Sequence, residues 1–245
     1  NPRHSSRNWL PLPLGVPVGQ FRSLMRVAIL SGALAGTVLF VYQYFLVVPR
    51  IIAAESYENE GTEAGNHEHP EWKPQGGFQR NVLTAAGTIL AGMGFAAVLV
   101  AAVSLTGASI TVLRGLLWGL AGFLCFVAAP ALGLPPVPPG VPVADLTERQ
   151  LWWTATVTAT AVGLFMLTKV RPNRLFGLFG AIFLLLPHMI GAPRSLAPHV
   201  IPEGLVQEFA IASVVGNGLF WVVLGLLGGF LLQSLPSNKA RDPLL

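Results

Sequence analysis

Long apolar stretches alternate with short polar ones along most of this 245-residue chain. The apolar stretches are continuous and do not switch between apolar and polar at every second residue, which favours helices over strands. A helix needs about 20 apolar residues to cross about 30 Å of hydrocarbon. We therefore predict an all-α integral membrane protein with six transmembrane helices. The predicted spans cover about 22–48, 80–105, 110–132, 150–168, 175–192 and 208–234.

The segments between and around these spans divide the rest of the chain. Residues 1–21 form a proline-rich irregular lead, residues 22–235 the six-helix transmembrane domain, and residues 236–245 a C-terminal tail. Two outer loops are expected. One is an acidic, histidine-bearing loop at 49–79, and the other is a stiff, proline-rich loop at 130–149. The fifth span is the shortest and ends among Pro187 and Pro193, so we expect its outer end to be broken.

The composition narrows the class of protein further. Hydrophobic residues make up 53% of the chain and charged residues only 11%, against about a quarter in an ordinary soluble domain. This balance argues against a water-soluble enzyme domain and against disorder. The net charge is +4, but the basic residues form no stripe, so we expect no nucleic-acid partner. With Cys125 as its one cysteine, the chain has no internal disulfide framework.

The charged residues divide unevenly between the two predicted sides of the membrane. Ten of the fifteen Lys and Arg residues fall on the side that holds both termini, and ten of the eleven acidic residues fall on the other side. Lysine and arginine are enriched in cytoplasmic connections. We therefore predict a multi-pass protein of the cell inner membrane with its N-terminus and C-terminus in the cytoplasm.

Pairs of glycines four residues apart recur within the predicted spans. They are Gly32 and Gly36, Gly115 and Gly119, and Gly225 and Gly229. Such pairs let two helix backbones approach closely. They fit simple bundle packing, and they also fit a sliding interface in a transporter.

The first outer loop contains candidate ligands for a divalent metal. In an extended segment His67 and His69 would point to the same side, and either Glu68 or Glu71 would complete a ligand shell around one ion. Glu55 and Glu58 add negative charge, which attracts cations. The alternative is a solvated acidic loop that happens to contain two histidines.

Three polar residues are expected in the outer half of the membrane. They are Gln43 near the end of the first span, His188 directly after Pro187, and Asn217 nine residues into the last span. Polar groups at such depth are functional candidates, and a proline leaves nearby carbonyls without a donor. We therefore hypothesise one polar vestibule formed by these three side chains. The alternative for each is an ordinary hydrogen bond between helices.

The sequence contains none of the common catalytic motifs that we looked for. It has no nucleophile elbow, no HExxH and no phosphate-binding GxxxxGK[ST]. We therefore expect that the protein is not an enzyme, and the sequence predicts no definite cofactor.

Several long segments together carry a family resemblance that covers nearly all of 22–235. They are AGTVLFVYQYFLVVPRIIAAESYE (35–58), RGLLWGLAGFLCFVAAPALGLPP (114–136), ADLTERQLWWTATVTATAVGL (144–164), LLLPHMIGAP (184–193) and FAIASVVGNGLFWVVLG (209–225). In this order, with a histidine-bearing loop, they resemble the CbtA-type predicted cobalt-transporter subunits.

The resemblance implies a membrane subunit of a divalent metal (cobalt) uptake transporter, with Co²⁺ as the transported ion. A short, one-span CbtB-type companion is the implied partner, beside the lipid membrane itself. The matching positions are Gln43, Glu55, Tyr57, Glu58, His67, His69, Arg80, Arg149, Gln150, Trp152, His188 and Asn217. The alternative function is a structural or accessory subunit of a larger membrane complex. In a pigment-containing complex, His188 would ligate the magnesium of a chlorophyll-type pigment.

Overall fold

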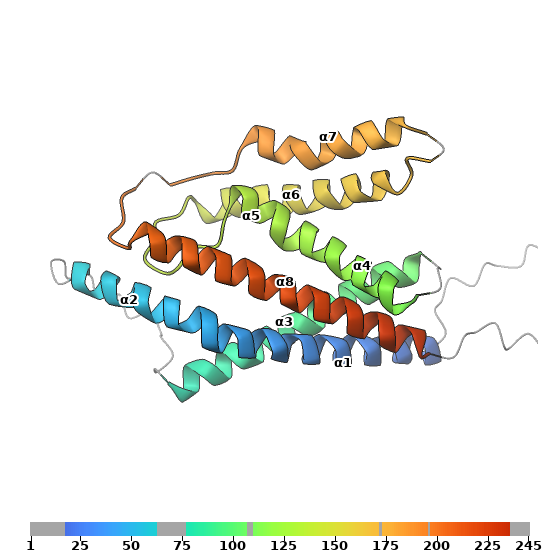
Figure 1. Ribbon diagram of the computed structural model, residues 1–245, viewed down its shortest axis with the longest axis horizontal. Coiled ribbons are helices and arrows are strands. Elements are labelled where there is room, and N and C mark those ends of the chain that lie inside the picture. Colours follow the sequence, from blue (N-terminus) through green and yellow to red (C-terminus); the bar gives the residue numbers. More distant parts are fainter. Residues whose placement is uncertain (1–17, 63–76, 107–109, 172, 196, 236–245) are drawn as a thin grey trace, which may run out of the picture.

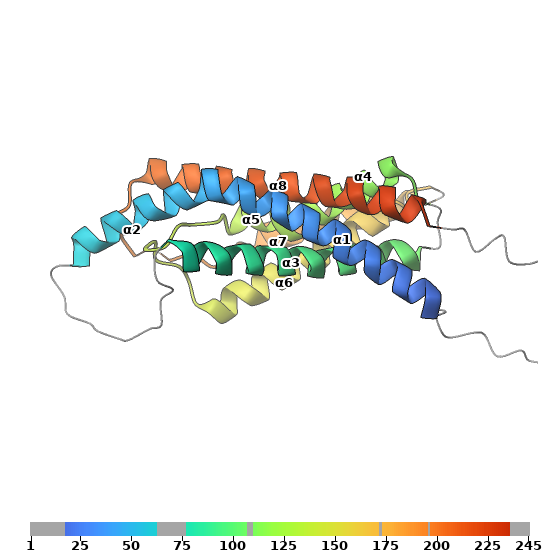
Figure 2. The same cartoon turned by 90° about the horizontal axis from the view of Figure 1, so that it is seen from below.

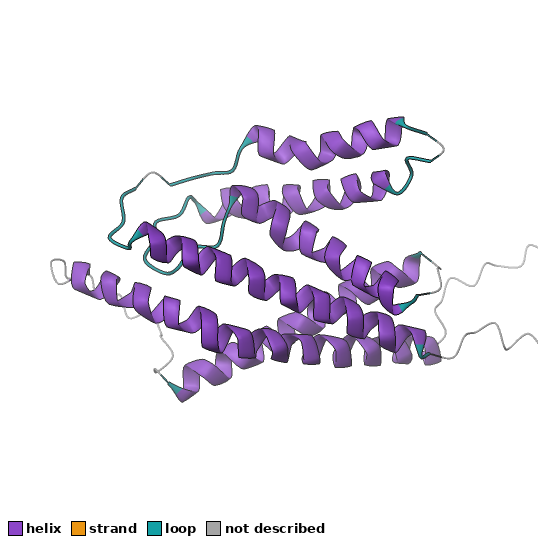
Figure 3. Ribbon diagram, viewed as in Figure 1, coloured by secondary structure: helices purple, strands orange, loops and turns teal. Residues whose placement is uncertain are grey.

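The computed structural model describes residues 18–62, 77–106, 110–171, 173–195 and 197–235. These residues form helices joined by short connections and contain no strand, as Figure 3 shows. In chain order the elements are α1 (Val18–Tyr42), η1 (Gln43–Val47), α2 (Val48–Thr62), α3 (Phe78–Leu105), α4 (Val112–Phe123), η2 (Leu124–Ala128), α5 (Ala129–Gly133), α6 (Leu146–Leu167), α7 (Leu175–Ile190) and α8 (Glu203–Gln233). The all-helical prediction is therefore confirmed for this part of the chain.

The two π-helical turns, η1 and η2, each join two α-helices into one continuous rod. The amide of Val48 donates to the carbonyl of Gln43, and that of Ala129 donates to the carbonyl of Leu124, so each bond spans five residues. Pro49 and Pro130 follow directly after these amides. A proline has no N–H and its ring crowds the carbonyl four residues earlier, so a wider turn lets the helix continue past it.

The six rods run along one common direction, and the described ends of the chain, at α1 and α8, lie at the same end of the bundle (Figures 1 and 2). The central four rods are α1, α3, α4 and α8, with α1 packed on α3 and α8, and α4 packed on α8. Their shared core includes Ala35, Leu99, Phe220, Trp221 and Leu224. The α6–α7 pair lies at one side of this group and touches it through η2 and α5.

Close glycine contacts hold the rods together in pairs. A Cβ atom added to Gly32 would lie 2.5 Å from the Cα of Met93 in α3, and one added to Gly115 would lie 2.4 Å from the carbonyl oxygen of Gly225. Only residues without a side chain allow backbones to come so near. The packing role predicted for the glycine pairs is therefore confirmed. The α6–α7 contact is built in the same way, around Gly163 and Gly180.

The rods match the six predicted spans in order, but some of the boundaries differ. The first helix continues to Thr62 and does not end near residue 48, because η1 lets it pass Pro49. Glu55 and Glu58 therefore lie on α2 and not in a loop. The helix α7 continues past Pro187 and ends at Ile190, where Gly191 adopts a positive φ of 88°, so Pro187 does not break the helix.

Four rods are long and apolar enough to cross a bilayer, and they span Gly19–Tyr57, Phe78–Leu105, Val112–Gly133 and Glu203–Gln233. The other two differ from them. With 16 residues, α7 is only about 24 Å long. At 22 residues α6 has the length, but it is not among the four helices that are apolar enough.

Candidate functional site

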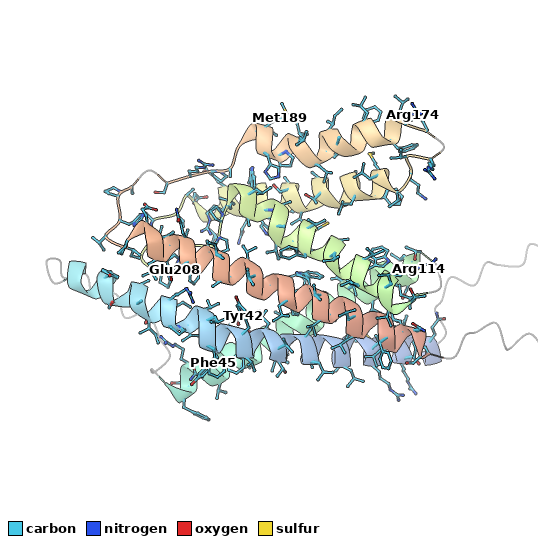
Figure 4. All side chains as sticks on the ribbon, viewed as in Figure 1. Tyr42, Phe45, Arg114, Arg174, Met189 and Glu208 are labelled. Carbon is cyan, nitrogen blue, oxygen red and sulfur yellow. The ribbon has the colours of Figure 1, made fainter. Side chains whose placement is uncertain are left out.

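The two ends of the bundle carry opposite charge. The described residues place Glu55, Glu58, Glu60, Asp145, Glu148, Glu203 and Glu208 at one end, which we call the acidic end. Arg22, Arg26, Arg114, Lys169, Arg171 and Arg174 lie at the other end, which we call the basic end. Figure 4 shows Glu208 at the acidic end, and Arg114 and Arg174 at the basic end. No acidic residue among those described lies at the basic end.

Two arginines reduce the negative charge at the acidic end by pairing with carboxylates on neighbouring helices. The Nη1 atom of Arg80 in α3 lies 3.2 Å from an oxygen of Glu55 in α2. The Nε atom of Arg50 in α2 lies 3.4 Å from an oxygen of Glu208 in α8, and its guanidinium also donates to the carbonyl of Leu46 in η1. A cation that uses Glu55 or Glu208 must therefore compete with an arginine.

The side chain of Gln43 forms a hydrogen bond between helices. It extends from η1, where its amide oxygen accepts a bond of 3.1 Å from the hydroxyl of Thr88 in α3. Both side chains are half-buried. Polar side chains are costly inside a membrane unless they are paired, so this bond accounts for the tolerance of Gln43 at its position.

Asn217 forms its hydrogen bond within its own helix. Its amide nitrogen donates to the carbonyl of Ser213, one turn earlier in α8, at 2.9 Å. Its amide oxygen accepts no hydrogen bond within the described part of the chain. The ring of Tyr42 packs against Gly216, since a Cβ atom there would lie 2.6 Å from the ring. Because Gln43 follows Tyr42 and Asn217 follows Gly216, the two amides lie at about the same level of the bundle.

The surroundings of His188 are aromatic. Its imidazole lies edge-on to the indole of Trp152 in α6, with ring centroids 6.0 Å apart, and is half-buried. The indole nitrogen of Trp152 donates to the carbonyl of Pro187 at 3.3 Å, and the amide of Gly191 donates to the same oxygen. The carbonyl of Pro187 is therefore not free to bind an ion. A Cβ atom on Gly133 would lie 2.4 Å from Trp152, so this indole fills the junction of α5, α6 and α7.

The structure does not bring the three predicted vestibule residues together. His188 lies on α7, at one edge of the bundle, and Gln43 belongs to the rod at the opposite edge (Figure 1). Gln43 and Asn217 lie on neighbouring rods, because η1 contacts α8. His188 was placed with them because it lies at a similar depth along the chain. Depth alone does not tell which helices are neighbours.

The ligands predicted in the first outer loop, His67, His69 and Glu71, lie outside the described residues. The backbone of Glu58 lies on α2, but its side chain is outside the description. No group of three or more His, Cys, Asp or Glu side chains that could hold one metal ion occurs among the residues that the structure describes.

Two side chains that pair with the candidate residues were not predicted from the sequence. Thr88 is the hydrogen-bond donor to Gln43, and Glu208 is the ion-pair partner of Arg50. Thr88 lies 45 residues from Gln43 along the chain, and no local pattern links them. Only the pairing of helices, which the glycine contacts set, brings such residues together.

The long apolar rods, the glycine contacts and the separation of charge define a helical membrane protein. The chain belongs to the CbtA family, described as probable cobalt transporter subunits, whose model matches residues 21–233. Membership in this family points to a subunit of a cobalt transporter. No curated protein and no solved structure matches the chain.

Proposed function

We propose that this protein is the membrane-spanning subunit of a cobalt uptake transporter of the inner membrane, without enzymatic activity of its own. The family supports cobalt as the transported ion. We further propose that all six rods cross the membrane, with the acidic end outside and both termini in the cytoplasm. The observation that carries this orientation is the absence of acidic residues, among those described, from the basic end.

Capture of the ion would begin at the acidic end. The segment between α2 and α3 contains His67, His69 and Glu71, and imidazole and carboxylate both bind borderline divalent ions. A cluster of negative charge raises the local cation concentration. We propose that these residues concentrate the ion and hold it only weakly.

The route onward would follow the rods of η1, α3 and α8. Gln43 and Asn217 provide amide oxygens at one level of the bundle, and Thr88 adds a hydroxyl. On the way the ion meets Glu55 and Glu208, each paired with an arginine. We propose that a divalent ion displaces these arginines and that their return moves the ion inward. His188 lies apart from this route. If it binds a metal ion, it does so beside Trp152, where α5, α6 and α7 meet.

Radioactive cobalt uptake tests this proposal in cells that lack the protein and carry a plasmid copy. Gln43→Leu removes the amide but keeps the volume, and we expect uptake to fall about tenfold. The matched control is Phe45→Leu in the same π-helical turn, where the side chain is 67% exposed on the outside of the bundle. Both variants must reach the membrane in equal amounts. Equal uptake by the two would remove Gln43 from the route, and full uptake without the protein would refute transport.

The loop is tested by the double variant His67→Ala with His69→Ala. Residues that only gather the ion lower the concentration at which uptake is half-maximal, and they leave the maximal rate unchanged. We therefore expect the KM for cobalt to rise about threefold to tenfold with the maximal rate retained. An unchanged KM would make the loop an ordinary solvated segment. His188→Ala in the same assay tests whether the imidazole takes part at all.

A second candidate function is an accessory subunit of a larger membrane complex. The observation that favours it is the exposed apolar face of α7, which packs on α6 and leaves Leu178, Ile182, Leu185 and Met189 uncovered. A one-span CbtB-type companion is the partner that we propose for this complex. Gentle purification with elemental analysis would show whether a companion and cobalt remain bound. An absorbance spectrum would show whether His188 ligates a pigment.

A further inference from the structure

An apolar groove lies between the central rods and α6. Its volume is about 540 Å³, and its walls come from α3, α4, α6 and α8. Its sides are formed by small and aliphatic residues, among them Ala102, Leu117, Ala121, Val157, Ala161 and Leu164. Trp221 and Phe126 form its floor, with their rings stacked at 5.6 Å and only 8° from parallel.

The groove exists because α6 faces away from α4. The Gly163 face of α6 packs on α7, so its opposite face, with Val157 and Ala161, is left open. The α4 rod is in turn drawn onto α8 by Gly115. Figure 1 shows α4 diverging from α6 as it runs from α5 toward the basic end. Contacts of α6 with α5 and η2 close the groove at the other end.

A single positive charge lies at the mouth of the groove. Thr106, Thr168 and Lys169 line the groove at the basic end. The ammonium of Lys169 lies over the ring of Phe165, 5.4 Å from its centroid, and pairs with no carboxylate among the described residues. Basic pockets between transmembrane helices on the cytoplasmic side are typical binding sites for anionic lipid head groups, and this inference rests on the orientation proposed above, which puts the basic end on that side.

We propose that one anionic phospholipid occupies this groove, with an acyl chain along α6 and its phosphate beside Lys169. From Val157 to Thr168 the groove extends about 17 Å, at 1.5 Å per residue. Half of the hydrocarbon layer measures about 15 Å, so the groove matches one leaflet in depth.

Tryptophan fluorescence provides the test, because Trp118 and Trp221 line the groove. The detergent-purified full chain is titrated with brominated phosphatidylglycerol, which quenches nearby indoles, or with brominated phosphatidylcholine of the same chain length. We expect saturable quenching, with phosphatidylglycerol binding about fivefold more tightly, since one basic residue near the surface supplies a preference of this size. Trp221 is 2% exposed, so a bromine reaches it only through the groove. Trp221→Phe should remove part of the saturable signal.

Substitutions distinguish binding of the lipid head group from binding of its acyl chain. Lys169→Gln should abolish the fivefold preference while quenching by both lipids persists, and Lys169→Arg should retain the preference. Ala161→Phe fills part of the groove without adding an indole and should reduce saturable quenching at Trp221. The matched control is Arg174→Gln, a basic residue at the same end that does not line the groove. Each variant is compared by its thermal unfolding in detergent.

Three outcomes would overturn the proposal. One is equal quenching of the original protein by the two lipids, and another is an unchanged preference in Lys169→Gln. The third is a one-span protein that copurifies and prevents quenching at Trp221, because a partner would then occupy the groove.

Discussion

In both the central four rods and the α6–α7 pair, helices pack through close glycine contacts, but the side chains around these contacts differ. Between α4 and α8, Gly115 and Gly119 meet Gly225 and Gly229, and the surrounding core is apolar. Between α6 and α7, one glycine pair at Gly163 and Gly180 is flanked by side chains that carry polar groups. Thr156, Thr160 and Trp152 are all buried there.

The two regions are therefore held together by different contacts. Lipid tails are as apolar as leucine, so apolar burial alone gives helices in a membrane no reason to associate. In the central rods, close backbone packing supplies the stability. In the α6–α7 pair only one glycine from each helix takes part, and the hydrogen bond from Trp152 to the carbonyl of Pro187 adds to this contact. We therefore expect the pair to separate before the central rods do.

The largest effect should follow from Gly115→Ala. The new Cβ atom would lie 2.4 Å from the carbonyl oxygen of Gly225 and 2.5 Å from the Cα of Gly229, and backbone cannot rotate aside as a side chain does. Overpacking of this kind costs about 2 kcal/mol. The measurement is unfolding in mixed detergent, followed by circular dichroism.

The matched control is Gly94→Ala in α3, where a Cβ atom meets nothing within 4 Å. Alanine is the better helix former, so this variant should be as stable as the original or slightly more stable. Equal destabilisation by the two variants would mean that α4 and α8 are not packed through Gly115.

A smaller effect, confined to the α6–α7 pair, should follow from Trp152→Phe. A smaller aromatic ring replaces the indole, so the bond from the indole nitrogen to the carbonyl of Pro187 is lost at a cost of about 1 kcal/mol, and part of the junction beside Gly133 is left unfilled. We expect increased proteolysis of the connection between α6 and α7, with the unfolding midpoint of the central rods nearly unchanged. Trp153→Phe is the matched control, because Trp153 is 38% exposed. Loss of the central rods in Trp152→Phe would show that the two regions unfold together.

Much of the fold was predictable from the sequence, because apolar length and glycine spacing are local properties. The glycine pairs in 22–48, 110–132 and 208–234 predicted the contacts that the structure contains. The extension of the first helix to Thr62 was not predictable from these patterns. It depends on a π-helical turn at Pro49, which apolar length does not reveal.

The candidate site was less predictable, because it depends on which rods are neighbours. Gln43 and Asn217 were chosen for their depth, and the structure places them on adjacent rods. His188 was chosen on the same ground, yet it lies on α7 at the far edge. The arginine partners of Glu55 and Glu208 come from other rods, so the acidic end is less negative than its acidic residues alone suggest.

The smallest effect should come from Thr160→Val, at the centre of the α6–α7 contact. The hydroxyl of Thr160 is buried and has no hydrogen-bond partner among the described residues. Its burial therefore costs desolvation free energy that no hydrogen bond offsets. Valine has nearly the same shape, so removing the hydroxyl should leave stability unchanged or raise it by up to about 1 kcal/mol. Thr156→Val is the comparison, because the hydroxyl of Thr156 donates to the carbonyl of Trp152 at 2.8 Å. Unfolding of the two variants in detergent should therefore differ in sign or in size. If Thr160→Val lowers the stability more than Thr156→Val does, the hydroxyl of Thr160 forms a hydrogen bond between α6 and α7. The α6–α7 contact would then depend on polar interactions even more than its buried threonines and Trp152 indicate.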